Sequence, residues 1–469
     1  MGHERLSVTD TTFLHLDAPA TPMNMGAVLI FEGGPLLDDA GRLRMDLVRR
    51  AAASVVPGRP RNRQRPMPVP FGLGRPVWVD DPDFDLDDHM DAVTLAEPTR
   101  EALFSMVAEW ITTPFERTRP LWSYRFVDGL PDGQVAVVAR VHHAHRDGGS
   151  ALASFEAMFS LTPDVPEFPT PEPWTPAPLP SRSALMGGAL SHQGRHAAKV
   201  ARIAGRAVRS PRRAAVRGRR MLAAVGPFVG KTRPVPRLSF NRPAGARRRL
   251  ATAVLPLDDC KAVRAAFGCT VNDVLVAAVA GGVRRLLVAR GECSPAVGVT
   301  VMCPVSNRAA GDASAGNQST ALTVTVQVAE PDPVARLRQV HAETSRAKDD
   351  DQAADMAFLV ELSDFVVPVM LRGAVRKVHG QQGYNLSVSN LAGPPVPLWL
   401  LGARLREIYP FAPLIGPTGV SVTALSHSGS LFVGFNACAE ALPDLDVLTA
   451  GVVAELAELV ARAGADGPA

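Results

Sequence analysis

A central stretch without a single carboxylate divides this chain into two halves. Residues 173–257 contain 18 Lys and Arg but no Asp or Glu, so the remainder carries 32 basic against 46 acidic residues, a net charge of −14, although the whole chain is at +4. The proline-rich residues 163–180 lie at its start and are typical of an extended, poorly packed segment. Because 469 residues exceed the usual size of one domain, about 150 residues, the sequence predicts a domain on each side of a linker. The predicted limits are 1–162, 163–236 and 237–469.

Both halves show mixed α and β patterns. In the first half, the short run 134–141 is rich in β-branched residues and predicts a buried strand, and residues 149–161 carry apolar side chains at helical spacing. In the second half, residues 255–290 predict the end of a strand followed by two helices. The second half also predicts four strands and a closing helix, at 299–305, 321–328, 420–425, 431–436 and 447–462. The expected fold class is therefore mixed α/β.

Two adjacent histidines follow the predicted strand of the first half. Residues 141–148 read Val-His-His-Ala-His-Arg-Asp-Gly and form a loop of the kind that borders a cleft. Since neighbouring residues of a strand point to opposite sides, one of His142 and His143 is expected to face a substrate while the other packs or orients it. An imidazole titrates near neutral pH and suits a general base. Asp147 is expected to hold the loop, and Gly148 permits a turn with positive φ.

The same loop allows two other interpretations. His143, His145 and Asp147 have the His-x-His-x-Asp spacing of some binuclear zinc hydrolases, but Gly148 stands where that motif has a further histidine. The other histidines show no ligand motif, so no metal site is predicted. The second alternative is that the histidines end the strand without any chemistry, and this alternative stays open.

The motifs of this chain resemble those of one enzyme family. His142 to Gly148 matches HHxxxDG, the active-site signature of the CoA-dependent acyltransferase superfamily, which includes chloramphenicol acetyltransferase and the condensation domains of peptide synthetases. Further segments resemble those of the bacterial wax ester synthase/diacylglycerol acyltransferase family: 6–10 with Phe13, 22–26, 78–81 with 84–86, 119–122 (RPLW), 269–275 (CTVNDVL), 304–308, and 385–390 with 393–394. The resemblance spans nearly the whole chain apart from the central insert, and the motifs keep the family's order.

This resemblance implies two chloramphenicol acetyltransferase-like domains with a tunnel at their interface. It also implies that His143 removes the proton of an alcohol, either diacylglycerol or a long-chain alcohol, which then attacks the thioester of a fatty acyl-CoA. Acyl-CoA is the substrate, and no other cofactor and no metal is expected. The residues expected to support His143 are the site-organising His142, Asp147 and Gly148, and the substrate-contacting Asn272, Asp273, Ser389 and Asn390. An alternative role for Asn272 and Asp273 is to cap the helix that follows them.

Two residues depart from the family's pattern. The variable positions of HHxxxDG are usually apolar or small, whereas this chain has His145 and Arg146 there. A cation beside the base lowers the base's pKa or binds an anionic group.

The basic insert predicts a membrane-binding segment. Its cations recur every three or four residues between 199 and 220, which would gather them on one helix face. We expect residues 195–220 to contact an anionic membrane or lipid body, with a solvated linker as the alternative. Nucleic acid is not an expected partner, because the insert has few aromatic residues and no recognised binding motif.

The expected location is the cytoplasm, with peripheral membrane or lipid-body association. The N-terminus lacks the apolar core of a secretory signal, and no window of about 18 uninterrupted apolar residues is present. The five cysteines are odd in number and form no C-x-x-C pair, which fits a reducing compartment. Two other functions stay open: a condensation-like enzyme that uses a carrier-bound acyl donor, and a weakly active acyl-binding protein of lipid bodies.

Overall fold

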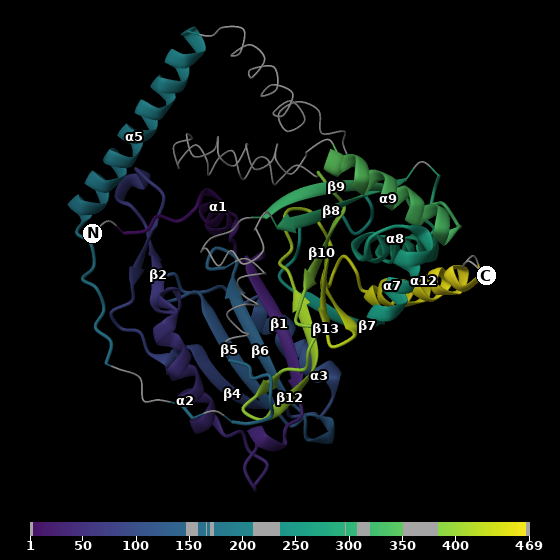
Figure 1. The fold of residues 1–469 in the computed structure, drawn as a ribbon, viewed down its shortest axis with the longest axis horizontal. Coiled ribbons are helices and arrows are strands. Elements are labelled where there is room, and N and C mark those ends of the chain that lie inside the picture. Colours follow the sequence, from purple (N-terminus) through teal and green to yellow (C-terminus); the bar gives the residue numbers. More distant parts are fainter. Residues whose placement is uncertain are drawn as a thin grey trace.

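The computed structural model describes residues 3–146, 158–165, 167–168, 173–209, 235–295, 297–306, 319–349 and 383–465. These residues form two six-stranded sheets that stand side by side, each with its own helices (Figure 1). A small sheet pairs β2 (Gln64–Met67) with β3 (Val77–Asp80). The predicted mixed α/β class is confirmed.

The first sheet has the strand order β11-β12-β1-β6-β5-β4. Its strands are β1 (Asn24–Phe31), β4 (Met90–Thr94), β5 (Trp122–Asp128), β6 (Val135–His142), β11 (Trp399–Leu400) and β12 (Ala403–Phe411). The predicted strand at 134–141 is β6, which is buried at all eight positions between β1 and β5. Helices α2 (Met45–Val55) and α3 (Arg100–Ile111) add side chains to the same core.

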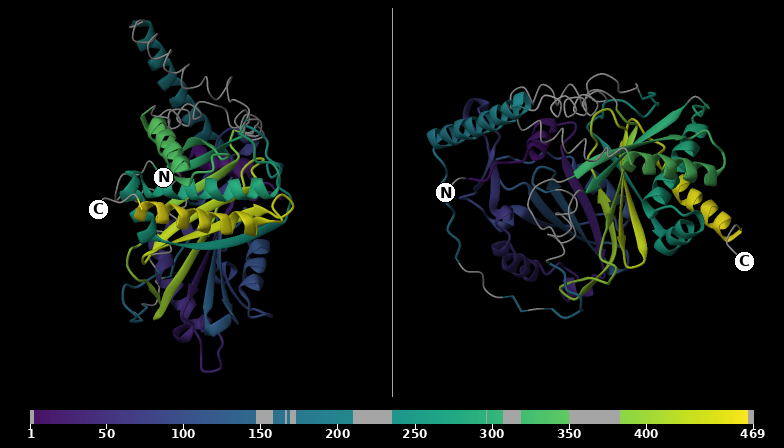
Figure 2. Two further views of the ribbon diagram at one scale, coloured as in Figure 1. Left: turned by 90° about the vertical axis from the view of Figure 1, so that its right-hand side faces the viewer. Right: turned by 45° about the horizontal axis from the view of Figure 1, so that its top comes forward.

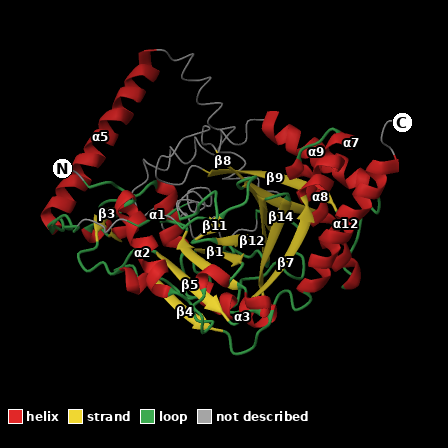
Figure 3. Ribbon diagram, turned by 60° about the horizontal axis from the view of Figure 1, so that its bottom comes forward, coloured by secondary structure: helices red, strands yellow, loops and turns green. Residues whose placement is uncertain are grey.

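The second sheet has the order β7-β14-β13-β10-β8-β9. Its strands are β7 (Arg248–Pro256), β8 (Gly298–Ser306), β9 (Ser319–Gln327), β10 (Leu386–Ala392), β13 (Val420–His427) and β14 (Ser430–Cys438). Its helices lie together on one side of the strands (Figure 3) and are α7 (Leu257–Phe267), α8 (Val271–Ala289), α9 (Pro333–Asp349) and α12 (Leu445–Ala465). The four strands and three helices predicted for this half are all present.

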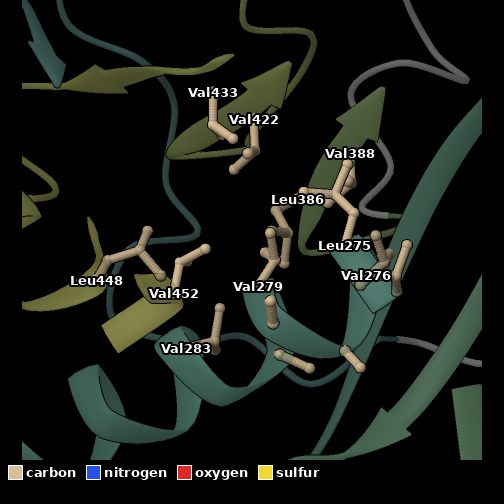
Figure 4. Close-up of a cluster of buried hydrophobic side chains, with 14 of the residues drawn as sticks. Leu275, Val276, Val279, Val283, Leu386, Val388, Val422, Val433, Leu448 and Val452 are labelled. Carbon is tan, nitrogen blue, oxygen red and sulfur yellow. The ribbon is translucent and has the colours of Figure 1, made fainter. Parts of the chain in front are cut away.

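Helix α8 forms the centre of the second domain. Val279 of α8 packs between the sheet, near Val422, and α12, near Val452 (Figure 4). Gly282 lets α8 approach α12 closely, because a Cβ at this position would lie 2.7 Å from the carbonyl oxygen of Leu448. The apolar run that follows Asn272 and Asp273 therefore serves as a core helix.

The two domains share strands. β12 pairs antiparallel with β1, although it lies in the second half of the chain, and Phe411 stands opposite Gly26. Arg100 of α3 fixes β12 by donating two hydrogen bonds, of 2.5 and 2.7 Å, to the carboxylate of Glu407. The predicted limits at 162 and 237 stay a prediction, and the first sheet is completed by residues from beyond them.

Helix α5 (Arg182–Arg209) extends away from the body of the molecule (Figures 1 and 2). Its first turns dock through the buried side chains of Leu185 and Ala189, and Gln193 donates a hydrogen bond to the carbonyl of Leu73. Among the described helices, none is by itself long and apolar enough to cross a membrane, and the pair α7 and α8, which meets those limits jointly, is bent by 102°.

Candidate active site

The histidine pair lies where β6 ends. His142 is the last residue of β6 and stands opposite Asn24, the first residue of β1. The chain then turns, since the His145 amide donates to the carbonyl of His142 at 2.8 Å. The His143 amide donates to the carbonyl of Met23 at 2.7 Å. The hydrogen bonds of two neighbouring strands thus hold the turn that carries both histidines.

His142 is locked in place. Its side chain is 1% exposed, and Nδ1 accepts a hydrogen bond of 3.0 Å from the Ala144 amide. In the neutral ring, this bond places the proton on Nε2, which faces Oδ2 of Asp17 at 3.5 Å. Of the two histidines, His142 is therefore the one whose ring is packed inside the domain, and its site-organising role stays a prediction.

Asp17 connects the two histidines. This residue caps the C-terminus of α1 (Val8–Leu16) and accepts hydrogen bonds from the Met23 amide at 3.0 Å and from Arg117 Nη2 at 3.1 Å. Burial raises the pKa of Asp17, but the interactions with His142, Met23 and Arg117 outweigh burial and lower the pKa to about 2. The carboxylate is thus charged at neutral pH, and it holds the Met23 segment whose carbonyl binds His143.

His143 points toward α1. Its half-buried ring stacks on Phe13, with ring centroids 3.8 Å apart and an interplanar angle of 15°. A backbone hydrogen bond and a parallel aromatic face therefore both restrain this imidazole. An imidazole held in this way suits proton transfer, provided that the substrate hydroxyl comes within about 3 Å of it.

Three residues of this site were missing from the predicted set: Asp17, Phe13 and Arg117. Phe13 marked only the resemblance of the N-terminal segment, and Asp17 and Arg117 lay between recognised motifs. Their contacts join positions about 100 or more residues apart in the chain, which no local spacing reveals. The sequence offered one indication of a role for Asp17: it lies six residues before Met23, which belongs to the motif at 22–26.

His145 lies on the other side of the turn. Its buried ring meets the edge of Trp78, with centroids 5.8 Å apart. Burial, and then the charges of Arg146 and Arg61, hold the pKa of His145 well below its usual value, so this ring is neutral at neutral pH. His143 and His145 thus face different partners. In the described part of the chain, no group of three or more His, Cys, Asp and Glu side chains is placed to hold a metal ion.

Asp147 and Gly148 lie outside the described residues, as does most of the helix predicted at 149–161. Their predicted roles stay predictions.

Asp273 serves as a helix cap in the second domain. Together with Thr270 it forms a capping box at the start of α8, and its carboxylate also binds His341 Nδ1 at 3.0 Å and the Thr344 hydroxyl at 2.8 Å. Burial raises the pKa of Asp273, but the hydrogen bonds from His341, Thr270 and Thr344 together lower it below its ordinary value. This arrangement agrees with the capping alternative and ties α8 to α9.

The structure brings some of the predicted residues together and separates others. His142 and His143 share one turn of the first domain. Asn272 lies half-buried beside Asp273 at the start of α8, and Ser389 and Asn390 lie half-buried on β10. Contact of these four residues with a substrate stays a prediction.

The first domain carries a histidine pair at the end of its central strand β6, and a second sheet domain lies beside it. This is the two-domain fold of the chloramphenicol acetyltransferase-like acyltransferases. The chain is similar to the first condensation domain of the calcium-dependent antibiotic synthetase, with a TM-score of 0.60 at 20% identity over 98% of this chain and 96% of that one. This likeness concerns the fold alone.

Family models assign the chain more specifically than the fold does. Residues 6–275 match the family model described as the wax ester synthase/diacylglycerol acyltransferase catalytic domain, and residues 315–460 match the C-terminal domain of the same family. The chain belongs to the wax ester synthase/diacylglycerol acyltransferase family.

Individual relatives agree with this assignment. A Mycobacterium tuberculosis protein named for diacylglycerol O-acyltransferase activity is 30% identical, over 97% of this chain and 90% of the relative. The solved wax ester synthase/diacylglycerol acyltransferase from Marinobacter aquaeolei has a TM-score of 0.66 at 25% identity, over 98% of this chain and 100% of that one. This chain is therefore an acyltransferase by family.

Proposed function

We propose that this protein transfers a long-chain fatty acyl group from acyl-CoA to the hydroxyl of diacylglycerol, and also to long-chain alcohols, with His143 as the general base. The observation that carries the proposal is the restraint of His143 by the Met23 carbonyl and the Phe13 ring, with His142 fixed behind it by Asp17. The names of the relatives, which refer to diacylglycerol and wax esters, support the choice of acceptors.

The reaction needs one base and no covalent acyl-enzyme. His143 accepts the proton of the acceptor hydroxyl while the oxygen attacks the thioester carbonyl carbon. The tetrahedral intermediate then collapses, the carbon–sulfur bond breaks, and the CoA thiolate receives the proton from His143. A backbone amide or a hydroxyl stabilises the oxyanion. Asp147 and Gly148 shape the loop, and acyl-CoA enters as substrate without a further cofactor.

A direct assay tests the proposal. Purified protein is incubated with palmitoyl-CoA and either dioleoylglycerol or hexadecanol, and free thiol and neutral lipid are followed together. We expect thiol release that depends on the acceptor and equals the amount of triacylglycerol or wax ester formed. If folded protein releases no thiol from palmitoyl-CoA with either acceptor but transfers acyl groups from an added palmitoyl carrier protein, the protein is instead a condensation-like enzyme. Lipid binding without turnover would identify an acyl-binding protein.

We also propose that residues 195–220, which comprise the second half of α5 and the residues that follow it, contact an anionic membrane or lipid-body surface. Helix α5 docks through Leu185 and Ala189 of its first turns, contains no acidic residue, and exposes Arg195 and Arg202 farther along. Residues 210–220 lie outside the described part of the chain. Such a surface would bring a water-insoluble acceptor close to the active site.

Removal of two cations tests this contact. Since each cation near an anionic surface contributes about 1 kcal/mol, the double change Arg195→Gln with Arg202→Gln is expected to weaken binding to vesicles about thirtyfold. Sedimentation with phosphatidylglycerol-containing vesicles measures the effect. Arg42→Gln with Arg50→Gln is the matched control, because these two arginines are exposed on the body of the protein. Equal loss in both double variants would count against a specific role of α5.

A further inference from the structure

A second polar cluster lies beside the turn that carries the histidine pair. Arg61, in the short 3-10 helix Pro60–Arg63, places its guanidinium 4.2 Å from the centre of the Trp78 ring. The ring of His145 meets the edge of the same Trp78, and Arg146 donates a hydrogen bond of 2.8 Å to the side chain of Asn62. One guanidinium and an imidazole thus contact Trp78, and a second guanidinium is fixed by the neighbouring Asn62.

Three nitrogen atoms of this cluster lack hydrogen-bond partners in the described part of the chain. They are Nη1 of Arg61 and both ring nitrogens of His145, and all three are buried. The His145 side chain is 5% exposed. A buried polar atom without a partner costs about 1–3 kcal/mol, and folded proteins contain few of them. These atoms therefore point to a ligand that accepts hydrogen bonds from Nη1 of Arg61 and from the one ring nitrogen of His145 that carries a proton.

The charge of the cluster indicates what kind of ligand fits. Arg61 has a carboxylate partner, Glu4, at 2.6 Å, but Glu4 is 60% exposed and occupies only the Nη2 side of the guanidinium. The second guanidinium, Arg146, adds a positive charge next to the neutral ring of His145. Guanidinium forks and a neutral imidazole N–H are donors, and together they match the oxygens of a phosphate or carboxylate group.

We infer that Arg61, His145 and Arg146 bind an anionic phosphate or carboxylate group that belongs to a substrate of the acyl transfer. This inference rests on the proposed function and adds a substrate class to it. His145 is two residues from His143, and its amide closes the turn on His142, so the two Cα atoms of His143 and His145 lie within about 7 Å. An anion bound here is therefore held by the turn that carries His143, on the Trp78 side of that turn.

Two substrates carry suitable groups, and paired substrates distinguish them. On the donor side, palmitoyl-CoA is compared with palmitoyl-pantetheine, which lacks the phosphates. On the acceptor side, 1-oleoylglycerol 3-phosphate is compared with 1-oleoylglycerol. For each pair, the ratio of kcat/KM for the anionic substrate to kcat/KM for the uncharged one is measured in wild type, Arg61→Gln and Arg146→Gln.

We expect one of the two ratios to fall at least tenfold in both variants, since a charge-assisted hydrogen bond is lost. A fall in the donor ratio assigns the anion to CoA, and a fall in the acceptor ratio assigns it to an acidic acceptor. Arg50→Gln, which changes an exposed arginine of α2, is the control and should leave both ratios within about twofold of wild type. If both ratios are unchanged in the folded Arg61→Gln and Arg146→Gln proteins, the inference is wrong.

A binding measurement separates this inference from the proposed function. If no substrate pair is turned over, the proposed function fails, and inorganic phosphate is then titrated into the wild type and variants while the melting temperature is followed. Stabilisation of the wild type that is lost in Arg61→Gln supports an anion site at this cluster, and equal behaviour of the two proteins contradicts it. Arg61→Lys retains the positive charge but lacks the paired N–H donors of a guanidinium. This variant replaces Arg61→Gln in the titration if Arg61→Gln does not fold.

Discussion

Replacement of His143 by alanine is expected to lower kcat for acyl transfer by about a hundredfold to ten-thousandfold. The variant loses the only proton acceptor that the proposed mechanism assigns to the acceptor hydroxyl. The hydrogen bond from the His143 amide to Met23 does not involve the imidazole and is retained, whereas the Phe13 ring loses its stacking partner, so folding of the variant is checked by circular dichroism. Thiol release and neutral lipid formation from palmitoyl-CoA and dioleoylglycerol measure the loss, and KM is expected to change far less than kcat.

The control for this variant is another buried histidine. His427, in the second domain, is 2% exposed and is bound through Nδ1 to the carbonyl of Pro394. His427→Gln is expected to retain most of the activity if folding is preserved, as judged by circular dichroism. Acceptor-dependent transfer at near wild-type rate in His143→Ala would exclude His143 as the base and would revive the possibility that the histidines merely end a strand.

Much of the fold could be predicted because its signals are local. The β-branched run of β6, the apolar spacing of α8 and the capping residue Asp273 are all read from neighbouring positions. The turn with its adjacent histidines follows from the place where β6 ends. Family motifs added the two-domain architecture, which periodicity alone does not specify.

The remaining features depend on contacts between distant segments. β12 lies in the second half of the chain but belongs to the first sheet. Nothing in the sequence of residues 403–411 indicates that this strand pairs with β1. Asp17 binds Arg117 and faces His142, so its role arises only when α1, β6 and the segment before β5 come together. Positions that act through another side chain therefore escape a search for catalytic residue types.

Removal of the carboxylate of Asp17 is expected to lower kcat about a hundredfold in Asp17→Ala, and about tenfold in Asp17→Asn. Asp17 faces His142 and binds the Met23 segment that holds His143, so its loss is expected to displace the imidazole of His143. A displacement of about 1 Å at a reacting group is enough to lower the rate a hundredfold. Asparagine still offers an oxygen to the Met23 amide but removes the charge next to His142, which explains the smaller effect. KM for both substrates is expected to stay within about twofold, because Asp17 is expected to contact neither substrate.

The pH dependence distinguishes a fixed charge from a titrating base. The pKa of Asp17, lowered to about 2, lies below the value of about 3.9 in an unfolded chain, so its contribution to stability is complete above pH 4 and is lost as the pH falls toward 2. Between pH 5 and 9, Asp17→Asn should therefore lower kcat by the same factor at every pH, whereas a titrating Asp17 would change that factor across the range. Asp38→Asn, which alters an exposed carboxylate that likewise accepts backbone hydrogen bonds, is the matched control and should leave kcat unchanged. Wild-type kcat in Asp17→Ala would show that the histidine pair keeps its orientation without this carboxylate.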